Sequence, residues 1–373
     1  MCFCGSGKRF KHCHGAVTID LPHEPIENWH LVPQTVRDAF INKQQERAEH
    51  HSKYGLHQPP AHAGVTGDRV IKRGDELLHW AGKGSFINFL EEDLLFRVGD
   101  ALEKHTDHPL REWLDELRRQ GRDRKAINPK AGLLSTVATM NFFTVAYDLY
   151  VVSDNSTLRD RLLKSLRVPA QFHGARYELM IAACLLRGGF DVQFTDETDD
   201  TTKHTDAFVR HLRTGTEYDV EMKAKGRSGV LGKPGVKIEP SEMNGNVSRQ
   251  IRRALTKPAE RERLIFIDMN LPPKPEHDGP FEVWWVHDAV QSLKMVREQP
   301  GKISSELSAF VIFSNSPSNF MPLGEVYEGL ETAFGAYNKP EFDKDFRVLG
   351  ERAPEIADLF DAFRLHSEFP DQF

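Results

Sequence analysis

The chain has 373 residues, of which 39% are hydrophobic and 28% are charged, a balance that is ordinary for a soluble protein. Its length exceeds that of one ordinary domain, so we expect two or three units and no shortage of buried core. The net charge of −6 gives no global support for nucleic-acid binding, so any such function must rest on local charge.

Three of the four cysteines lie within the first fourteen residues, in the pattern C-x-C, eight residues, then C-H. Structural zinc is bound by four soft or borderline ligands in a tetrahedron. Gly5 and Gly7 let so short a loop fold back to supply them. His12 could compete for the fourth position. We therefore predict a zinc site whose ligands are Cys2, Cys4, Cys13 and His14.

This segment resembles the SEC-C motif, a small zinc-binding module best known from the tail of the SecA translocation ATPase. Lys8, Lys11 and the turn at residues 5–7 stand where the motif has them, while Phe3 replaces the usual proline and is not a ligand. The resemblance covers about residues 1–15 and implies a closed, structural zinc site that docks a partner and does no chemistry. The alternative is an N-terminus with incidental thiols.

The fourth cysteine, Cys184, stands apart from the others. Thiols in metal spacing argue for a reducing compartment, because disulfide frameworks use paired and scattered cysteines. No charged-then-apolar leader precedes the zinc pattern, so we expect a cytoplasmic protein. The longest apolar stretch, residues 135–152, contains Asn141 and Asp148 and is predicted to be a buried helix rather than a membrane span.

Residues 17–65 form a mostly polar stretch with helical pieces. Its histidines, at positions 50, 51, 57 and 62, lack regular spacing, so a surface loop is favoured over a metal site. Residues 84–167 carry apolar side chains at helical spacing and predict a helical region without an assignable motif, for which target recognition would be a reasonable use. Pro169 and Gly174 mark the next boundary.

From Ala175 onward the pattern alternates between helix and strand. An amphipathic helix with apolar residues from Tyr177 to Leu185 ends at the glycine pair 188–189. The predicted order is αβββαβ followed by further β and α elements, and residues 324–373 are expected to be helical. Strands are predicted at 191–194, 206–212, 218–224, 264–269, 281–286 and 309–313, and helices at 241–256 and 288–297.

Three acidic residues and one lysine of this region form a candidate site. Fourteen residues separate Asp206 from Glu221, and a hairpin that turns at 213–215 would bring them opposite each other, with Cβ atoms about 5 Å apart. Two carboxylates at that separation can share Mg²⁺, which keeps part of its shell for water and phosphate oxygens. Strand alternation sends Glu221 and Lys223 to one face, so Lys223 reaches the same place.

The arrangement resembles the PD-(D/E)XK nuclease superfamily, which has an acid on the first helix, an Asp on the second strand and an E-x-K on the third. The resemblance spans about residues 170–270 and implies a restriction-endonuclease-like α/β fold. Asp206 and Glu221 would bind Mg²⁺ (or Mn²⁺), Glu178 would add a direct or water-mediated contact, and Lys223 would position or deprotonate the attacking water. Gln250 falls where many members have a polar residue, while Thr205 replaces the usual proline.

The resemblances divide the chain into four parts. Residues 1–16 are the SEC-C-like motif and 17–168 a mainly helical region, residues 169–323 are the nuclease-like domain, and 324–373 a helical end.

An E-x-K triplet alone is weak evidence, because it also occurs by chance on solvated strand edges. Order, spacing and face together favour the site. Glu178 could instead cap or coat its helix, and Gln250 could be an ordinary surface residue.

Local charge agrees with a phosphate-bearing partner. Residues 221–263 contain eleven basic side chains against five acidic ones, within a chain of negative net charge. Such a patch would contact a nucleic-acid backbone without reading its sequence, although a charge run can also be a solvated face. The basic residues are Lys223, Lys225, Arg227, Lys233, Lys237, Arg249, Arg252, Arg253, Lys257, Arg261 and Arg263.

Two functions follow from these patterns. The first is a cytoplasmic, Mg²⁺-dependent nuclease acting on DNA, with the zinc segment as a docking element for a protein or nucleic acid. The second is an inactive nuclease-fold adaptor that binds a protein partner, a chaperone or the ribosome, through its SEC-C motif.

Overall fold

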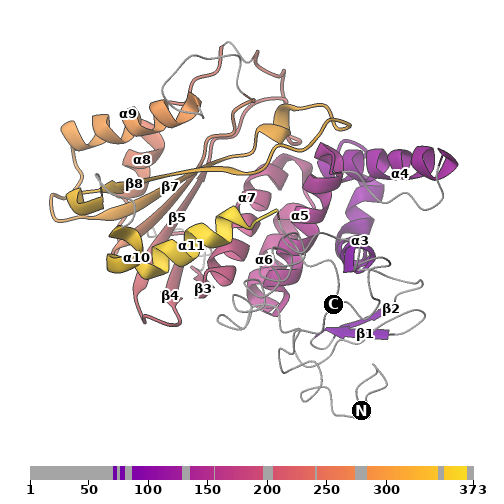
Figure 1. Ribbon diagram of the computed structural model, residues 1–373, viewed down its shortest axis with the longest axis horizontal. Helices are drawn as coiled ribbons and strands as arrows, with labels where there is room; N and C mark the ends of the chain where they lie inside the picture. Colours follow the sequence, from indigo (N-terminus) through magenta and orange to yellow (C-terminus); the bar gives the residue numbers. More distant parts are fainter. Residues whose placement is uncertain are drawn as a thin grey trace, which may run out of the picture. The chain divides into compact units, whose positions relative to one another are not determined.

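The computed structural model describes residues 70–73, 76–79, 86–127, 135–154, 156–195, 205–239, 242–273, 284–342 and 348–367 (Figure 1). The chain divides into two compact units, residues 1–85 and 86–373. In the first unit the described residues form an antiparallel pair that sequence analysis missed, β1 (Val70–Arg73) and β2 (Glu76–His79). The predicted zinc ligands and the stretch 17–65 lie outside the described residues.

The second unit begins with the predicted helical region. Its helices are α3 (Phe86–Lys104), α4 (Pro109–Ile127), α5 (Val137–Val151) and α6 (Ser156–Leu166), with a short 3-10 turn η2 (Val152–Asp154). α3, α4 and α7 pack against α5, and nearly every residue of α5 is buried, as its apolar composition requires. The side chain of Thr136 caps α5 by accepting a hydrogen bond from the Thr139 N–H.

A six-stranded mixed sheet follows, with its strands neighbouring one another in chain order. The first two pairs are antiparallel, the next two are parallel and the last is antiparallel. The strands are β3 (Phe190–Phe194), β4 (Ala207–His211), β5 (Glu217–Ala224), β6 (Arg263–Asp268), β7 (Ala309–Asn315) and β8 (Glu331–Tyr337).

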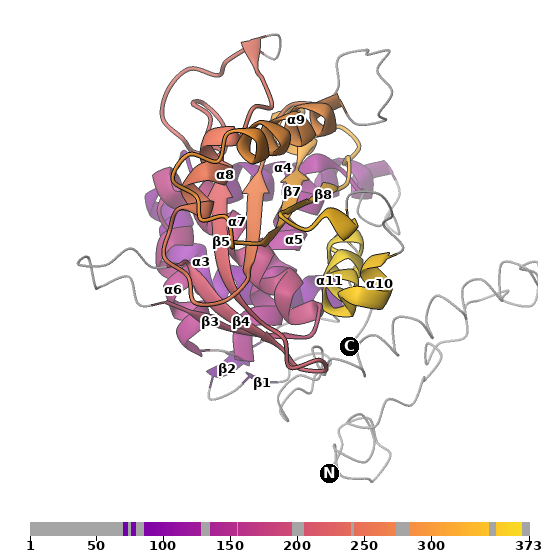
Figure 2. The same cartoon turned by 90° about the vertical axis from the view of Figure 1, so that its left-hand side faces the viewer.

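Helices cover both faces of this sheet (Figure 1). On one face α8 (Ser248–Leu255) and α9 (Trp284–Glu298) lie side by side and enclose a core with Ile265 and Ile267 of β6 (Figure 2). On the other face are α7 (Pro169–Arg187) and α11 (Pro354–Arg364), where Phe363 contacts the ring of Phe266. Because strand side chains alternate, successive residues of β5 and β6 point to different helix layers.

The order α7, β3, β4, β5, α8, β6 is the predicted αβββαβ order. α7 begins earlier than the helix predicted from Ala175, because Pro169 occupies its first turn and Gly174 lies inside it. A proline is tolerated there since the first N–H groups of a helix have no partner within it. The helix ends at Arg187, and Gly188 follows as its cap.

Two predictions beyond β6 are wrong. Residues 284–286, expected in a strand, form the first turn of α9, in which Trp285, Ala289 and Val296 are buried at helical spacing. Within 324–373, expected to be helical, β8 pairs with β7 as a strand. Its Gly335 lowers the strand signal, but a Cβ there would lie 2.5 Å from Leu293 Cδ2, so the glycine makes room for α9.

α8 is shorter than predicted and begins at Ser248 rather than 241. The cause is local, since the Asn246 side chain accepts hydrogen bonds from the N–H and hydroxyl of Ser248, and the Gly245 N–H donates to Asp288. The remaining short helices are η4 (Pro317–Phe320), η5 (Pro340–Phe342) and α10 (Val348–Arg352).

The chain's last described residues are fastened to the helical layer. The Arg187 guanidinium, at the end of α7, donates to the carbonyl oxygens of Leu365 and His366 at 2.5 and 3.3 Å. The ring Nε2 of His366 lies 3.0 Å from a carboxylate oxygen of Asp148 on α5, and both side chains are buried. The C-terminal segment therefore closes a polar cluster inside the unit.

Candidate active site

The hairpin of β4 and β5 brings Asp206 and Glu221 together as predicted. Ala207 is opposite Val220, and the Asp206 N–H donates to the Val220 carbonyl at 2.9 Å, so Asp206 faces Glu221 across the pair. The turn passes through Gly215, whose φ of 74° is one that glycine adopts readily.

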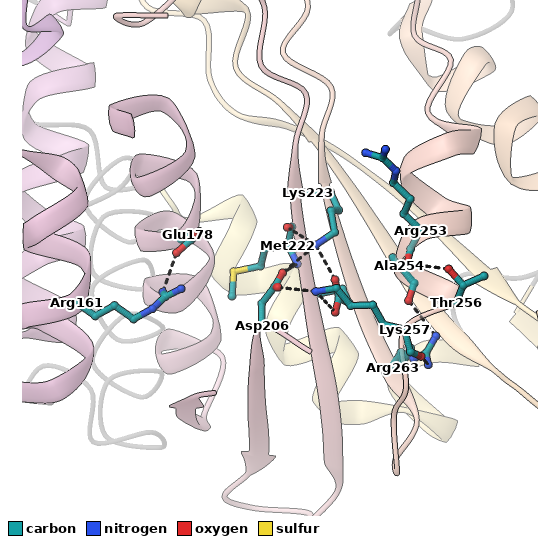
Figure 3. Close-up of polar contacts among 11 residues, drawn as sticks. Arg161, Glu178, Asp206, Met222, Lys223, Arg253, Ala254, Thr256, Lys257 and Arg263 are labelled. Carbon is teal, nitrogen blue, oxygen red and sulfur yellow. Dashed lines mark hydrogen bonds and ion pairs between the residues drawn. The ribbon is translucent and has the colours of Figure 1, made fainter. Parts of the chain in front are cut away.

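Alternation along β5 directs Glu221 and Lys223 to the same side. Lys223 Nζ lies 2.6 Å from Glu221 Oε2 and 3.1 Å from Asp206 Oδ2 (Figure 3). The intervening Met222 points the other way, and its N–H donates to Asp206 Oδ2 at 2.7 Å. The three predicted residues therefore meet at one point.

Lys257 is a fourth member of this cluster, which sequence analysis counted only as part of a basic stretch. Its Nζ lies 2.9 Å from Asp206 Oδ1 and 2.8 Å from Glu221 Oε1, between the two carboxylates (Figure 3). Lys257 follows the end of α8 and precedes Pro258, which cannot continue the helix. The position next to that proline was a signal for a turn, but nothing in the sequence indicated that the turn would reach Asp206.

Local charges push the pKa values of the two carboxyl groups apart. Burial raises the pKa of Asp206, but Lys223, the Met222 N–H and Lys257 outweigh it and leave that pKa below its ordinary value. Burial and then repulsion by Asp206 raise the pKa of Glu221, against the attraction of the lysines. Two neighbouring carboxyl groups with separated pKa values are typical of functional sites.

Glu178 and Gln250 do not join the four charges. The Glu178 carboxylate receives a hydrogen bond of 2.8 Å from Arg161 of α6, on the α7 side of the sheet (Figure 3). Its helix packs on the face opposite to Glu221, which explains the separation. Gln250 is half-buried on α8, and among the described residues the hydrogen bonds to Asp206 come from Met222, Lys223 and Lys257 and not from Gln250.

The basic stretch is only partly available to a phosphate-bearing partner. Arg263 and Arg227 are buried and donate to backbone carbonyls, and Arg261 pairs with Glu217 and Asp219. Lys225 and Arg252 also donate to backbone carbonyls. Lys233, Lys237, Arg249 and Arg253 are exposed.

The donor set at Asp206 and Glu221 fits a divalent cation with an incomplete protein shell. No three His, Cys, Asp or Glu side chains gather into a metal site among the described residues, which therefore offer two carboxylates at this place. Glu221 is fully buried, and neither of its oxygens receives a well-directed hydrogen bond from the described residues, although each faces an ammonium. Mg²⁺ commonly binds one or two carboxylates and leaves its other positions to water and phosphate.

Comparison with known proteins identifies one segment. Residues 1–16 match the SEC-C motif, a zinc-binding type, which agrees with the predicted zinc segment. No curated protein and no solved structure matches the chain. Of the helices in the described ranges, none has the length and apolar character that crossing a lipid bilayer requires.

Proposed function

We propose that the second unit is a metal-dependent nuclease with a restriction-endonuclease-like core, hydrolysing phosphodiester bonds in DNA. The observation that carries the proposal is the convergence of Asp206, Glu221 and Lys223 from β4 and β5 within an αβββαβ order. A helix-flanked hairpin that presents two carboxylates and an amine at one point is suited to phosphoryl chemistry, because the carboxylates could hold a cation, and that cation and the amine would stabilise the negative charge that develops on the phosphate.

Each residue has a role that its surroundings support. Asp206 and Glu221 would bind Mg²⁺ or Mn²⁺, with the buried Glu221 as the inner ligand and the partly exposed Asp206 facing solvent. When bound, the ion would polarise the phosphoryl group, lower the pKa of water and neutralise developing charge. Lys223, in contact with both carboxylates, would donate a hydrogen bond to the attacking water and stabilise negative charge on the phosphate.

Exposed basic residues on α8 support a polyanionic substrate. Arg249 and Arg253 are four residues apart, so they lie on one face of the helix that leads to Lys257. Guanidinium groups in such a row would contact successive phosphates without reading bases. We expect the affinity for DNA to fall with salt, and Arg253→Gln to reduce the slope of log K against log salt by about 1.

The test is cleavage of plasmid, linear duplex and single-stranded DNA, each with and without Mg²⁺ or Mn²⁺. Wild type should cut only with metal. Asp206→Asn, which alters one of the two proposed metal ligands, should cut at least about 100-fold more slowly, a loss of about 2.7 kcal/mol of transition-state stabilisation. Asp191→Asn, at an exposed position of β3, is the matched control and should retain activity. Equal cleavage by wild type and Asp206→Asn would refute the proposal.

The balance of charges in the cluster favours a second function. Two carboxylates and two ammonium groups neutralise one another without a metal, as they could in a site that has lost its catalytic activity. The chain would then be an adaptor that binds a protein partner, a chaperone or the ribosome, through the SEC-C motif matched at residues 1–16. For this function Cys4→Ser should abolish partner binding, Asp206→Asn should leave it unchanged, and wild type should cut none of the substrates.

A further inference from the structure

Lys257 occupies the space between the two carboxylates on which the proposed function depends. Its Nζ contacts Asp206 Oδ1 and Glu221 Oε1 at 2.9 and 2.8 Å, while Lys223 contacts the other oxygen of each group. All four carboxylate oxygens therefore face an ammonium group. A divalent cation needs the same oxygens, and one position between two carboxylates cannot hold two cations at once.

The backbone that carries Lys257 is anchored by hydrogen bonds, whereas the end of its side chain is held by its two ion pairs. The buried Arg263 guanidinium donates to the carbonyl oxygens of Ala254 and Lys257, which anchors the end of α8 to β6. The side chain beyond that anchor is a flexible four-carbon stem, and 23% of it is exposed. Lys257 can therefore leave the carboxylates by changing rotamer without any movement of the fold.

We propose that Lys257 is a built-in counter-ion of the metal site: it holds Asp206 and Glu221 together in the metal-free protein, and a divalent cation must displace it to bind. This inference rests on the proposed function for the identity of the metal-binding pair. Displacement makes metal binding weaker than the two carboxylates alone would allow. It also frees an ammonium group beside the site, and a phosphate-bearing substrate would stabilise the displaced position.

The direct test measures binding of Mn²⁺ in the absence of DNA. Isothermal titration should give a dissociation constant for Lys257→Met at least about 10-fold lower than for wild type, because the Lys257 ammonium no longer has to be displaced. Lys294→Met makes the same chemical change at an exposed position of α9 and should leave the constant within about twofold. Adding Asp206→Asn to Lys257→Met should abolish the gain, since it removes one of the two ligands.

Thermal unfolding gives a second readout with a predicted sign. Without metal, Lys257→Met should melt below wild type, because buried Glu221 loses one of its two counter-charges. Saturating Mn²⁺ should raise the melting temperature of the variant by more than that of wild type, reversing or closing the gap. If Lys257→Met does not fold, Lys257→Gln, which shortens the stem but keeps a polar end, is expected to show the same ordering.

The results separate this inference from the proposed function. Tighter Mn²⁺ binding by Lys257→Met without DNA cleavage by either protein would support the counter-ion role and reject the nuclease. Metal-dependent cleavage by wild type together with an unchanged or higher dissociation constant for Lys257→Met would support the nuclease and overturn the counter-ion role. Failure of both proteins to bind Mn²⁺ would also overturn it.

Discussion

Replacing Arg263 by methionine tests whether a buried arginine anchors the end of α8. The side chain is 2% exposed, and its guanidinium donates to Ala254 O at 3.0 Å and to the carbonyl of Lys257. In a continuing helix the Ala254 carbonyl would accept from residue 258, but that residue is proline and has no N–H. Arg263 therefore supplies a hydrogen bond that the backbone cannot.

The magnitude follows from the two hydrogen bonds. A hydrogen bond to a charged group contributes about 1.5–3 kcal/mol, and a carbonyl left buried without a partner costs about 1–3 kcal/mol. Removing the guanidinium also removes its own burial cost, which offsets part of the loss. We expect Arg263→Met to lower the free energy of unfolding by about 3 kcal/mol. If that free energy falls by about 3 kcal/mol per molar urea, the urea midpoint should decrease by about 1 M.

The matched control is Arg253→Met, which makes the same chemical change at an exposed position of α8. It should alter the free energy of unfolding by no more than about 0.5 kcal/mol. Urea unfolding followed by circular dichroism compares the two variants with wild type at pH 7. An equal loss in both variants, or no loss in Arg263→Met, would show that the anchor is not needed.

Two further predictions concern pH and backbone space. Burial, and secondarily Arg227, lowers the pKa of Lys225 to about 8, while the unfolded chain keeps that proton up to about pH 10.5. Between these pH values unfolding takes up a proton, so the free energy of unfolding of wild type relative to that of Lys225→Met should rise from pH 8 to 10.5. Urea titrations at several pH values measure this difference, and a difference that does not change with pH would contradict the prediction. Gly174→Ala, with no atom within 4 Å of the new Cβ, should stabilise by about 0.5–1 kcal/mol. Gly232→Ala, with φ at 74° and a Cβ 2.6 Å from the Pro169 carbonyl oxygen, should destabilise by about 1–3 kcal/mol, and the reverse order of the two variants would be inconsistent with the backbone described here.

The part of the site that sequence analysis predicted is the part that depends on local geometry. Asp206 and Glu221 face each other because one hairpin joins them, and Lys223 follows by strand alternation. Both placements follow from the position of one turn and from the two-residue alternation of side chains along a strand. The zinc pattern in residues 1–16 is similar, since its predicted ligands are close in the sequence and a known motif matches the segment.

The missed features depend on contacts between distant elements. Lys257 reaches Asp206 only because Arg263 of β6 holds the end of α8, and no periodicity records that contact. Glu178 is polar at the edge of a buried stripe, which leaves open whether it faces the site or, as in the structure, Arg161. In β8, Gly335 is a poor strand former, but the absence of a Cβ there leaves room for the side chain of Leu293.

The anchoring of the last described residues has a consequence for how the protein is made. Asp148 and Arg187 are synthesised long before Leu365 and His366, the groups that complete their contacts. During translation the acid and the guanidinium inside the helical layer lack those partners until residues 365 and 366 have emerged from the ribosome. A variant truncated before residue 365 would lack these contacts permanently. We therefore expect it to aggregate rather than to fold into a smaller domain.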